Sequence, residues 1–241
     1  MRIAVGTSGF SYLPWRGRFY PADLPAEQML GFYARRFDTV ELNNTFYRLP
    51  SRERLAAWAR EVPPGFCFSL KASQRITHVA RLKGAAEVLS VFLTNAGELG
   101  GMLGPVLFLL PPSLRPDTAL LSDFLDLLPQ NLRAAFAFRH RGWLMDDHVP
   151  DLLHRHGKAV CFEETDESST PWVSTADYGY LRLRRLTYSH GDLAALAKAI
   201  HEQPWREAFA YFKHEEQARG PAYAAQLKQL LAGVPERPAA E

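Results

Sequence analysis

Eight short apolar segments alternate with stretches of helical spacing along almost the whole chain. Each has the period-two pattern or the short apolar run of a strand, and the predicted strands cover 3–7, 39–43, 66–71, 105–110, 134–138, 159–163, 178–183 and 208–213. Helices are predicted after seven of them, at 25–36, 53–62, 85–99, 118–128, 147–156, 192–203 and 217–231. The sixth strand is followed instead by a Ser/Thr-rich loop, 165–177.

This alternation predicts an α/β fold with a parallel sheet, because strands that alternate with helices form βαβ units. Eight such units in 241 residues match the size of a (β/α)8 barrel of the TIM type. An open doubly wound sheet is the competing architecture. No shift in composition marks a boundary, so we expect a single barrel domain over 1–233 and a disordered tail over 234–241.

Charge and hydropathy narrow the classes of function. The net charge of +2 gives no overall field that would favour nucleic acid or a membrane, so any basic surface must be local. No stretch approaches the roughly 20 apolar residues that span a bilayer, and the first residues lack the pattern of a signal peptide. Cys67 and Cys161 each lie in an apolar run, which favours buried free thiols. We therefore expect a cytoplasmic protein with no membrane partner.

The second strand and the loop after it, 37–50, carry the clearest sign of a functional site. Glu41 and Asn43 alternate with Val40 and Leu42, so the carboxylate and the amide are predicted to point toward the middle of the protein. In a barrel the site lies at the carboxyl ends of the strands. Other polar residues at these positions are Thr7, Ser8, Lys71, Arg139, His140, Glu163, Glu164, Arg182, Arg184, Lys213, His214 and Glu215.

Basic side chains from strands three, five, seven and eight would thus converge on the carboxyl-terminal end of the barrel, here called the mouth. One or two carboxylates would lie there as well. We predict that this mouth binds an anion, a phosphate above all. Arginine makes paired hydrogen bonds to phosphate, and barrels often bind phosphate after strands seven and eight. The alternative is that Glu41 pairs with Lys71 or Arg182 as a structural ion pair, and the two interpretations are compatible.

Glu41 and Lys71 are the candidates for chemistry at this mouth. Glu41 would act as a general acid or base, so Glu41→Gln is expected to abolish turnover with little loss of fold. Lys71 lies beside other cations and could act as a nucleophile or base, and its alternative role is charge pairing. His78 is predicted in the loop after the third strand, where it would be an acid or a helix cap.

The first loop, 8–23, interleaves aromatic and basic residues, and a loop of this length in a compact barrel is often a lid or binding loop. Tyr12 and Trp15, together with Tyr47 from the second loop, would form a stacking surface for bases or sugars. The alternative is that Trp15 and Phe19 plug the mouth or pack on a helix.

A metal site is a weaker alternative, and no cofactor is predicted. Suitable donor atoms occur in Glu41, His140, Glu163, His214 and Glu215. However, no short motif such as HExxH is present, and the nearby cations oppose a further positive charge. The segment GTSGFS does not match GxGxxG, and GxxxxGK[ST] is absent, so nucleotide cofactors of those classes are not expected.

Five segments resemble successive motifs of one known family. They are GTSGFSYLPWRGRFYP (6–21), FDTVELNNTFYRLP (37–50), FSLKASQRITH (68–78), LGPVLFLLPPS (103–113) and FAFRHRGW (136–143). In these the chain is similar to the YecE-like family, also called domain of unknown function 72, and the resemblance runs over 6–231. It implies a TIM-type barrel and no established reaction. The chain departs from the family pattern at Ala137, where a Glu is usual, at Arg184, where a His is usual, and in the run YFKHEE after the last strand.

Three functions follow from these patterns. The first is an enzyme, such as a hydrolase or lyase, that acts on a phosphate-bearing or other small anionic substrate held by Arg139, Arg182 and Arg184. The second is a non-catalytic nucleic-acid-binding protein that uses the basic mouth and the aromatic first loop. The third is a degenerate barrel that serves as a scaffold for a partner protein, which the departures at Ala137 and Arg184 favour.

Overall fold

The computed structural model describes residues 1–233, and the predicted disordered tail, 234–241, lies outside the described residues. Eight parallel strands pair in chain order, and β1 pairs with β8 to close the barrel. The strands are β1 (Arg2–Ser8), β2 (Thr39–Leu42), β3 (Cys67–Lys71), β4 (Leu103–Leu110), β5 (Ala134–Phe138), β6 (Ala159–Glu164), β7 (Tyr178–Leu183) and β8 (Glu207–Phe212). The predicted TIM-like barrel is confirmed.

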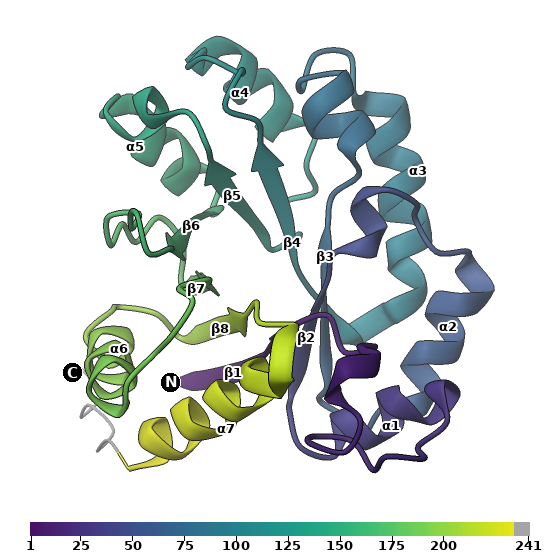
Figure 1. Cartoon of the computed structure of the whole chain (residues 1–241). Coiled ribbons are helices and arrows are strands. Elements are labelled where there is room, and N and C mark those ends of the chain that lie inside the picture. The colour runs from purple at the N-terminus through teal and green to yellow at the C-terminus, as the bar shows by residue number, and fades with distance from the viewer. Residues whose placement is uncertain (234–241) are drawn as a thin grey trace.

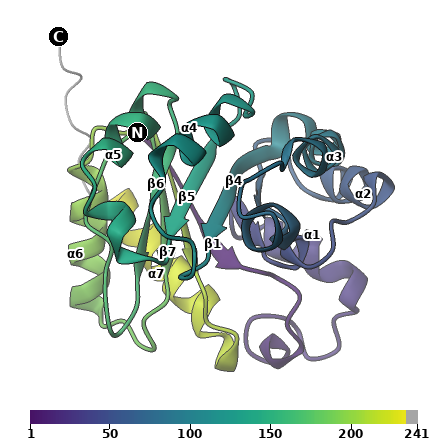
Figure 2. The same cartoon turned by 90° about the horizontal axis from the view of Figure 1, so that it is seen from above.

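Seven α-helices surround the barrel in this part of the chain (Figure 1). They are α1 (Met29–Ala34), α2 (Arg52–Glu61), α3 (Ala86–Ala96), α4 (Thr118–Asp126), α5 (His148–Arg155), α6 (His190–His201) and α7 (Arg219–Ala232). Figure 2 shows α1, α2 and α3 on one side of the barrel and α4, α5 and α6 on the other. Ser51, Asp117 and Ser189 begin α2, α4 and α6, because each side chain accepts a hydrogen bond from the backbone N–H three residues later.

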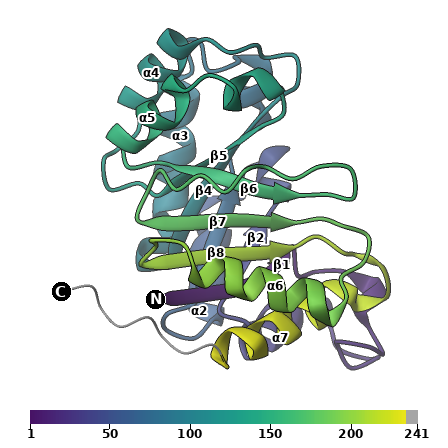
Figure 3. The ribbon, with the colours of Figure 1, turned by 90° about the vertical axis from the view of Figure 1, so that its left-hand side faces the viewer.

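The wall formed by β6 and β7 differs from the rest of the barrel, because no α-helix follows β6 (Figure 3). The loop 165–177 takes that place, as the sequence predicts. Within it, Trp172 stacks on Phe162 at a ring-centroid distance of 4.1 Å and contacts Trp205 at 6.1 Å. These aromatic rings supply the apolar cover that a helix provides for the other strands.

No helix within residues 1–233 has the length and apolar character that crossing a bilayer requires.

The interior of the barrel is packed with side chains of unequal size. Tyr180 and Tyr211 are fully buried on β7 and β8, and small residues such as Ala135 and Ala137 belong to the same cluster. The Tyr211 hydroxyl lies 2.8 Å from the Thr39 hydroxyl, and the Tyr180 hydroxyl lies 2.9 Å from that of Ser69. Hydrogen bonds therefore connect the strands across the interior, below the carboxyl ends where a barrel site is expected.

Gly6 of β1 pairs with Thr39 of β2, and we predict that it does not tolerate a side chain. A Cβ atom here would lie 2.0 Å from the carbonyl oxygen of Thr39 and 2.8 Å from the hydroxyl of Tyr33. Tyr33 cannot move away freely, because its hydroxyl donates to Thr39 O and accepts from Thr7 N. Gly6→Ala should therefore lower the free energy of unfolding, measured in urea, by about 2 kcal/mol.

Gly97→Ala is the matched control, because a Cβ at Gly97 would meet no heavy atom within 4 Å. It should change the free energy of unfolding by less than about 0.5 kcal/mol. Equal effects of the two substitutions would contradict the close packing of β1 against β2.

Candidate functional site

A buried ion pair between Glu41 and Arg182 lies inside the mouth of the barrel. Glu41 is at the end of β2 and Arg182 near the end of β7, and their exposed fractions are 0% and 3%. Arg182 donates from Nε to Oε2 over 2.9 Å and from Nη2 to Oε1 over 3.2 Å. This paired geometry is the structural pairing that the sequence left as an alternative for Glu41.

Three further groups hold the Glu41 carboxylate. Ser8 Oγ donates over 2.6 Å and Asn43 Nδ2 over 3.1 Å to Oε1, while the Tyr180 hydroxyl donates over 2.7 Å to Oε2. Burial alone would raise the pKa of Glu41, but Arg182 and these hydrogen bonds lower that pKa to about 2. Glu41 is therefore charged at neutral pH with both oxygens occupied, which suits positioning Arg182 better than moving protons.

Glu163, on β6, accepts hydrogen bonds from three arginines of the mouth. Its Oε1 accepts from Arg139 Nη2 at 2.9 Å, Arg182 Nη1 at 3.2 Å and Arg184 Nη1 at 2.8 Å. The side chains of Arg139 and Arg184 are 30% and 26% exposed. Each of these two guanidinium groups gives Glu163 one of its N–H donors, so others remain for a ligand.

Lys71 and Lys213 complete the mouth at the ends of β3 and β8. Across residues 1–233, neither ammonium group lies within ion-pair distance of a carboxylate. Lys71 Nζ lies instead 3.9 Å from the ring centroid of Phe46. Burial and the nearby Arg182 lower the pKa of Lys71 to about 8. Burial also lowers the pKa of Lys213, and Arg184 and Arg182 add to this effect.

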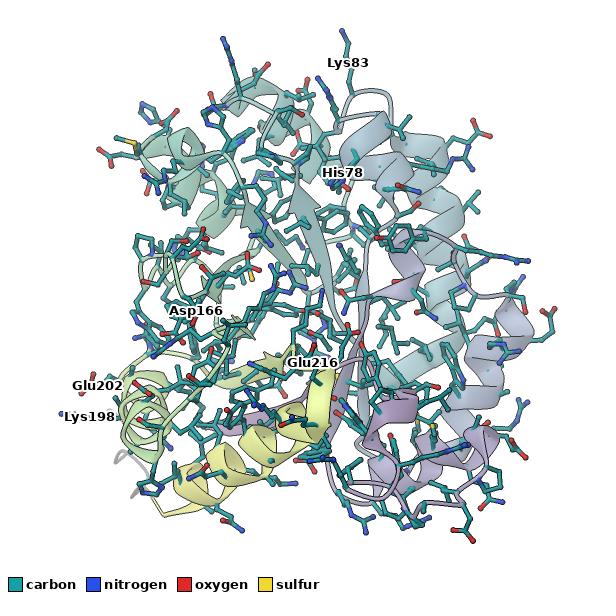
Figure 4. The ribbon with its side chains drawn as sticks, in the orientation of Figure 1. His78, Lys83, Asp166, Lys198, Glu202 and Glu216 are labelled. Atoms are coloured by element: carbon teal, nitrogen blue, oxygen red, sulfur yellow. The ribbon has the colours of Figure 1, made fainter. Side chains whose placement is uncertain are left out.

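The inward-facing side chains at the strand ends give the mouth a net positive charge. Five are basic and two are carboxylates, a net charge of +3 in the set Lys71, Arg139, Arg182, Arg184, Lys213, Glu41 and Glu163. Figure 4 looks toward this end of the barrel, and its labels on His78, Asp166 and Glu216 mark the loops after β3, β6 and β8.

His78 lies beside Lys71 rather than in an irregular loop. It belongs to a single π-helical turn, Arg75–Val79, so the predicted loop is wrong here. Its ring meets Phe46 edge-on at 4.9 Å, and Nδ1 lies 2.8 Å from the Thr77 hydroxyl. Burial and the charge of Lys71 lower the pKa of His78. Phe46 therefore contacts both Lys71 and His78.

Two other predicted ligand-binding residues, Ser8 and His140, bond to groups of the protein itself. Ser8 is 2% exposed and its hydroxyl is committed to Glu41. His140 Nδ1 accepts from the backbone N–H of Gly142 at 3.1 Å, so this imidazole caps the turn after β5. Asn43 is partly exposed beside the ion pair, and its Oδ1 lies 3.5 Å from Arg182 Nη2.

The first loop packs against the body of the protein. Trp15 is 1% exposed and its Nε1 donates to Glu215 O at 2.8 Å. Phe19 contacts Phe32 of α1 at 5.7 Å, which is the packing alternative that the sequence left open. Tyr12 donates its hydroxyl to Ser8 O at 2.7 Å. The predicted stacking surface of Tyr12, Trp15 and Tyr47 does not form, because the Trp15 ring has no free face.

The five predicted metal donors are not brought together. The two carboxylates at the mouth are bonded to arginines, and His214 turns to the outer side of β8. His214 Nε2 bonds to the carbonyl of Arg185, and the ring contacts Tyr188 and Tyr223. In the described part of the chain, no three His, Cys, Asp or Glu side chains are grouped so that they could hold a metal ion.

Tyr180 is the site residue that the sequence reasoning missed. It lies two positions before Arg182 on β7, so the same period-two pattern places both side chains inside the barrel. The Tyr180 hydroxyl bonds to Glu41, a contact that the sequence analysis did not anticipate. The two-residue spacing from Arg182 was therefore the signal in the sequence that could have placed Tyr180 at the site.

Comparison with known proteins agrees with this fold and with the sequence motifs. Residues 4–241 match the family model described as protein of unknown function DUF72. The chain belongs to the DUF72 family. The resemblance to YecE-like proteins is thereby confirmed.

Two relatives show how far the similarity of this DUF72 chain extends. It is 33% identical over 124 residues to UPF0759 protein YecE of Escherichia coli K12, a match that covers 51% of this chain and 46% of that protein. It therefore matches about half the length of this relative. Identity to UPF0759 protein YunF of Bacillus subtilis is 24% over 230 residues, covering 89% of this chain and 79% of that protein.

Solved structures of DUF72 family proteins have the same architecture. One from Thermotoga maritima has a TM-score of 0.80 and 25% identity, covering 96% of this chain and 100% of that chain. One from Enterococcus faecalis has a TM-score of 0.78 and 18% identity, covering 96% of this chain and 98% of that chain. The second likeness concerns the fold alone. None of these names states a reaction.

Proposed function

We propose that this protein is an enzyme that acts on a small phosphate-bearing or other anionic substrate at the mouth of the barrel. The observation that carries the proposal is the excess of positive charge there. Lys71 and Lys213 have no carboxylate partner among residues 1–233, and Arg139 and Arg184 are partly exposed with unused N–H donors. A phosphate or carboxylate entering the mouth would supply the missing acceptors.

The contacts divide the roles among the mouth residues. Glu41 and Glu163 both accept hydrogen bonds from Arg182 and hold its guanidinium group in place, and the anion would bind next to this group. Arg184 and Lys213 would bind the anion from β7 and β8. Lys71 is the better candidate for proton transfer, because its pKa of about 8 lies near neutral pH and Glu41 is already saturated.

Binding of inorganic phosphate, followed by calorimetry at low salt, tests the first part of this proposal. We expect binding to be weakened about tenfold by Arg184→Ala, because one charge-assisted hydrogen bond is lost. Lys228→Ala is the matched control, since it removes one positive charge from a surface lysine whose Nζ lies 2.7 Å from Asp38. Lys228→Ala should bind as the wild type does. Absence of phosphate binding, or equal loss in both variants, would contradict the proposal.

Turnover is tested by incubating the protein with a panel of phosphate monoesters and phosphorylated carbonyl compounds, followed by phosphorus NMR. A product that forms with the wild type and not with Lys71→Ala supports the enzyme. A single-stranded oligonucleotide is the comparison ligand. Tighter binding than phosphate, with an affinity that falls steeply with salt, would favour the nucleic-acid alternative.

A further inference from the structure

Lys71 differs from Lys158 and Lys228 in the partners of its amine, and from Lys213 in being half-buried rather than exposed. Lys158 Nζ is held by the carbonyls of Pro129, Gln130 and Leu132, and Lys228 pairs with Asp38. Lys71 Nζ has no hydrogen-bond acceptor within the described residues, and its contact is the face of the Phe46 ring. An inward-facing amine that is neither paired nor fully exposed is free to react.

We propose that Lys71 forms an imine with the carbonyl carbon of a substrate whose phosphate or carboxylate group is held by Arg184 and Lys213. This inference rests on the proposed function, because the anion site positions the carbonyl over Lys71. It narrows the substrate to a class, the small carbonyl compounds that carry an anionic group. The reacting group is the neutral amine, and burial with the nearby Arg182 favours that form.

The step balances with groups that the mouth contains. The neutral Nζ adds to the carbonyl carbon, which forms a C–N bond and moves the carbonyl electrons to oxygen. The carbinolamine then loses its oxygen as water, with two protons that come from the amine, and C=N remains. His78 contacts the same Phe46 ring, and burial together with the charge of Lys71 lowers its pKa, which favours the neutral imidazole. In this proposal His78 carries the proton from nitrogen to oxygen.

Reductive trapping tests the imine directly. The protein is incubated with glyceraldehyde 3-phosphate or with pyruvate, reduced with borohydride, and digested for peptide mass spectrometry. At pH 7.5 we expect at least about tenfold more adduct at Lys71 than at the exposed Lys83 and Lys198, because an amine with a pKa near 8 has a much larger neutral fraction. Comparing the yield of adduct from pyruvate with that from glyceraldehyde 3-phosphate shows whether the mouth prefers a carboxylate or a phosphate.

Two controls separate this inference from the proposed function. Lys71→Arg keeps the positive charge but has no primary amine, so it should lose the preferred adduct, while phosphate binding is measured on the wild type. Uncharged glyceraldehyde should label Lys71 about tenfold less than its phosphate, since it lacks the group that the arginines hold. Inorganic phosphate should compete with both anionic probes.

The outcomes can be told apart. Phosphate binding without preferred labelling of Lys71 would overturn the imine and leave the anion site standing. Labelling of Lys71 that is equal with glyceraldehyde and its phosphate, and without phosphate binding, would overturn the anionic substrate class and with it the proposed function.

Discussion

Replacing Glu41 by glutamine should lower the free energy of unfolding by about 3–5 kcal/mol, the usual result of removing one partner from a buried ion pair. Arg182 would keep its charge while 3% exposed, and only Glu163 would remain as a charged partner. The sequence alone suggested that this substitution would spare the fold. The structure reverses that expectation, because the carboxylate accepts five hydrogen bonds in the barrel interior.

Glu207→Gln is the matched control for this measurement in urea. Glu207 also contacts two arginines, Arg2 and Arg133, but at the opposite end of the barrel and with side chains that are 28–55% exposed. Glu207→Gln should lower the free energy of unfolding by at most about 1 kcal/mol. If Glu41→Gln were no more destabilising than Glu207→Gln, the structural role of the Glu41–Arg182 pair would be refuted.

The pH dependence of stability gives a second, independent measurement on Glu41. The pKa of Glu41 is lowered in the folded protein from 4.5 to about 2, so the unfolded chain takes up a proton first as the pH falls. The contribution of Glu41 is therefore complete above about pH 4.5 and is lost progressively toward pH 2. The stability difference between the wild type and Glu41→Gln should narrow over that window and stay constant above it.

Lys158→Met should cost about 2–4 kcal/mol of unfolding free energy, although Lys158 is far from the proposed site. Lys158 is 1% exposed just before β6, and its Nζ donates to the carbonyls of Pro129, Gln130 and Leu132 at 2.8–3.2 Å. Methionine retains an apolar stem but no donor, so three carbonyl oxygens of the segment that leads into β5 lose the hydrogen bond from Lys158, and Pro129 O keeps the backbone N–H of Leu132.

Lys198→Met provides the comparison on α6. The Lys198 side chain is 78% exposed and meets Glu202 at 3.8 Å. Its substitution should change the stability by less than about 0.5 kcal/mol. Both variants should bind inorganic phosphate as the wild type does, because neither residue lies at the mouth. A Lys158→Met protein of wild-type stability would mean that the three carbonyl bonds contribute nothing net.

The sequence by itself determined the order of the elements and the direction of the strand side chains. The predicted bounds of β5 and β7 coincide with the observed ones, because β5 is a short apolar run and β7 alternates inward-facing with outward-facing residues. Period-two alternation also placed Glu41, Lys71 and Arg182 inside the barrel. These are local properties, which a few neighbouring residues are enough to define.

Only the tertiary structure decided which inward groups meet. Closure of the barrel brings Arg182 to Glu41 across 141 positions of the chain, while Lys71, on the strand next to Glu41, has no carboxylate partner in the described part. Likewise, Trp15 is buried because the loop after β8 reaches its indole N–H. Alternation fixes the face of a strand on which a side chain lies, but partners on the same face depend on the curvature and register of all eight strands.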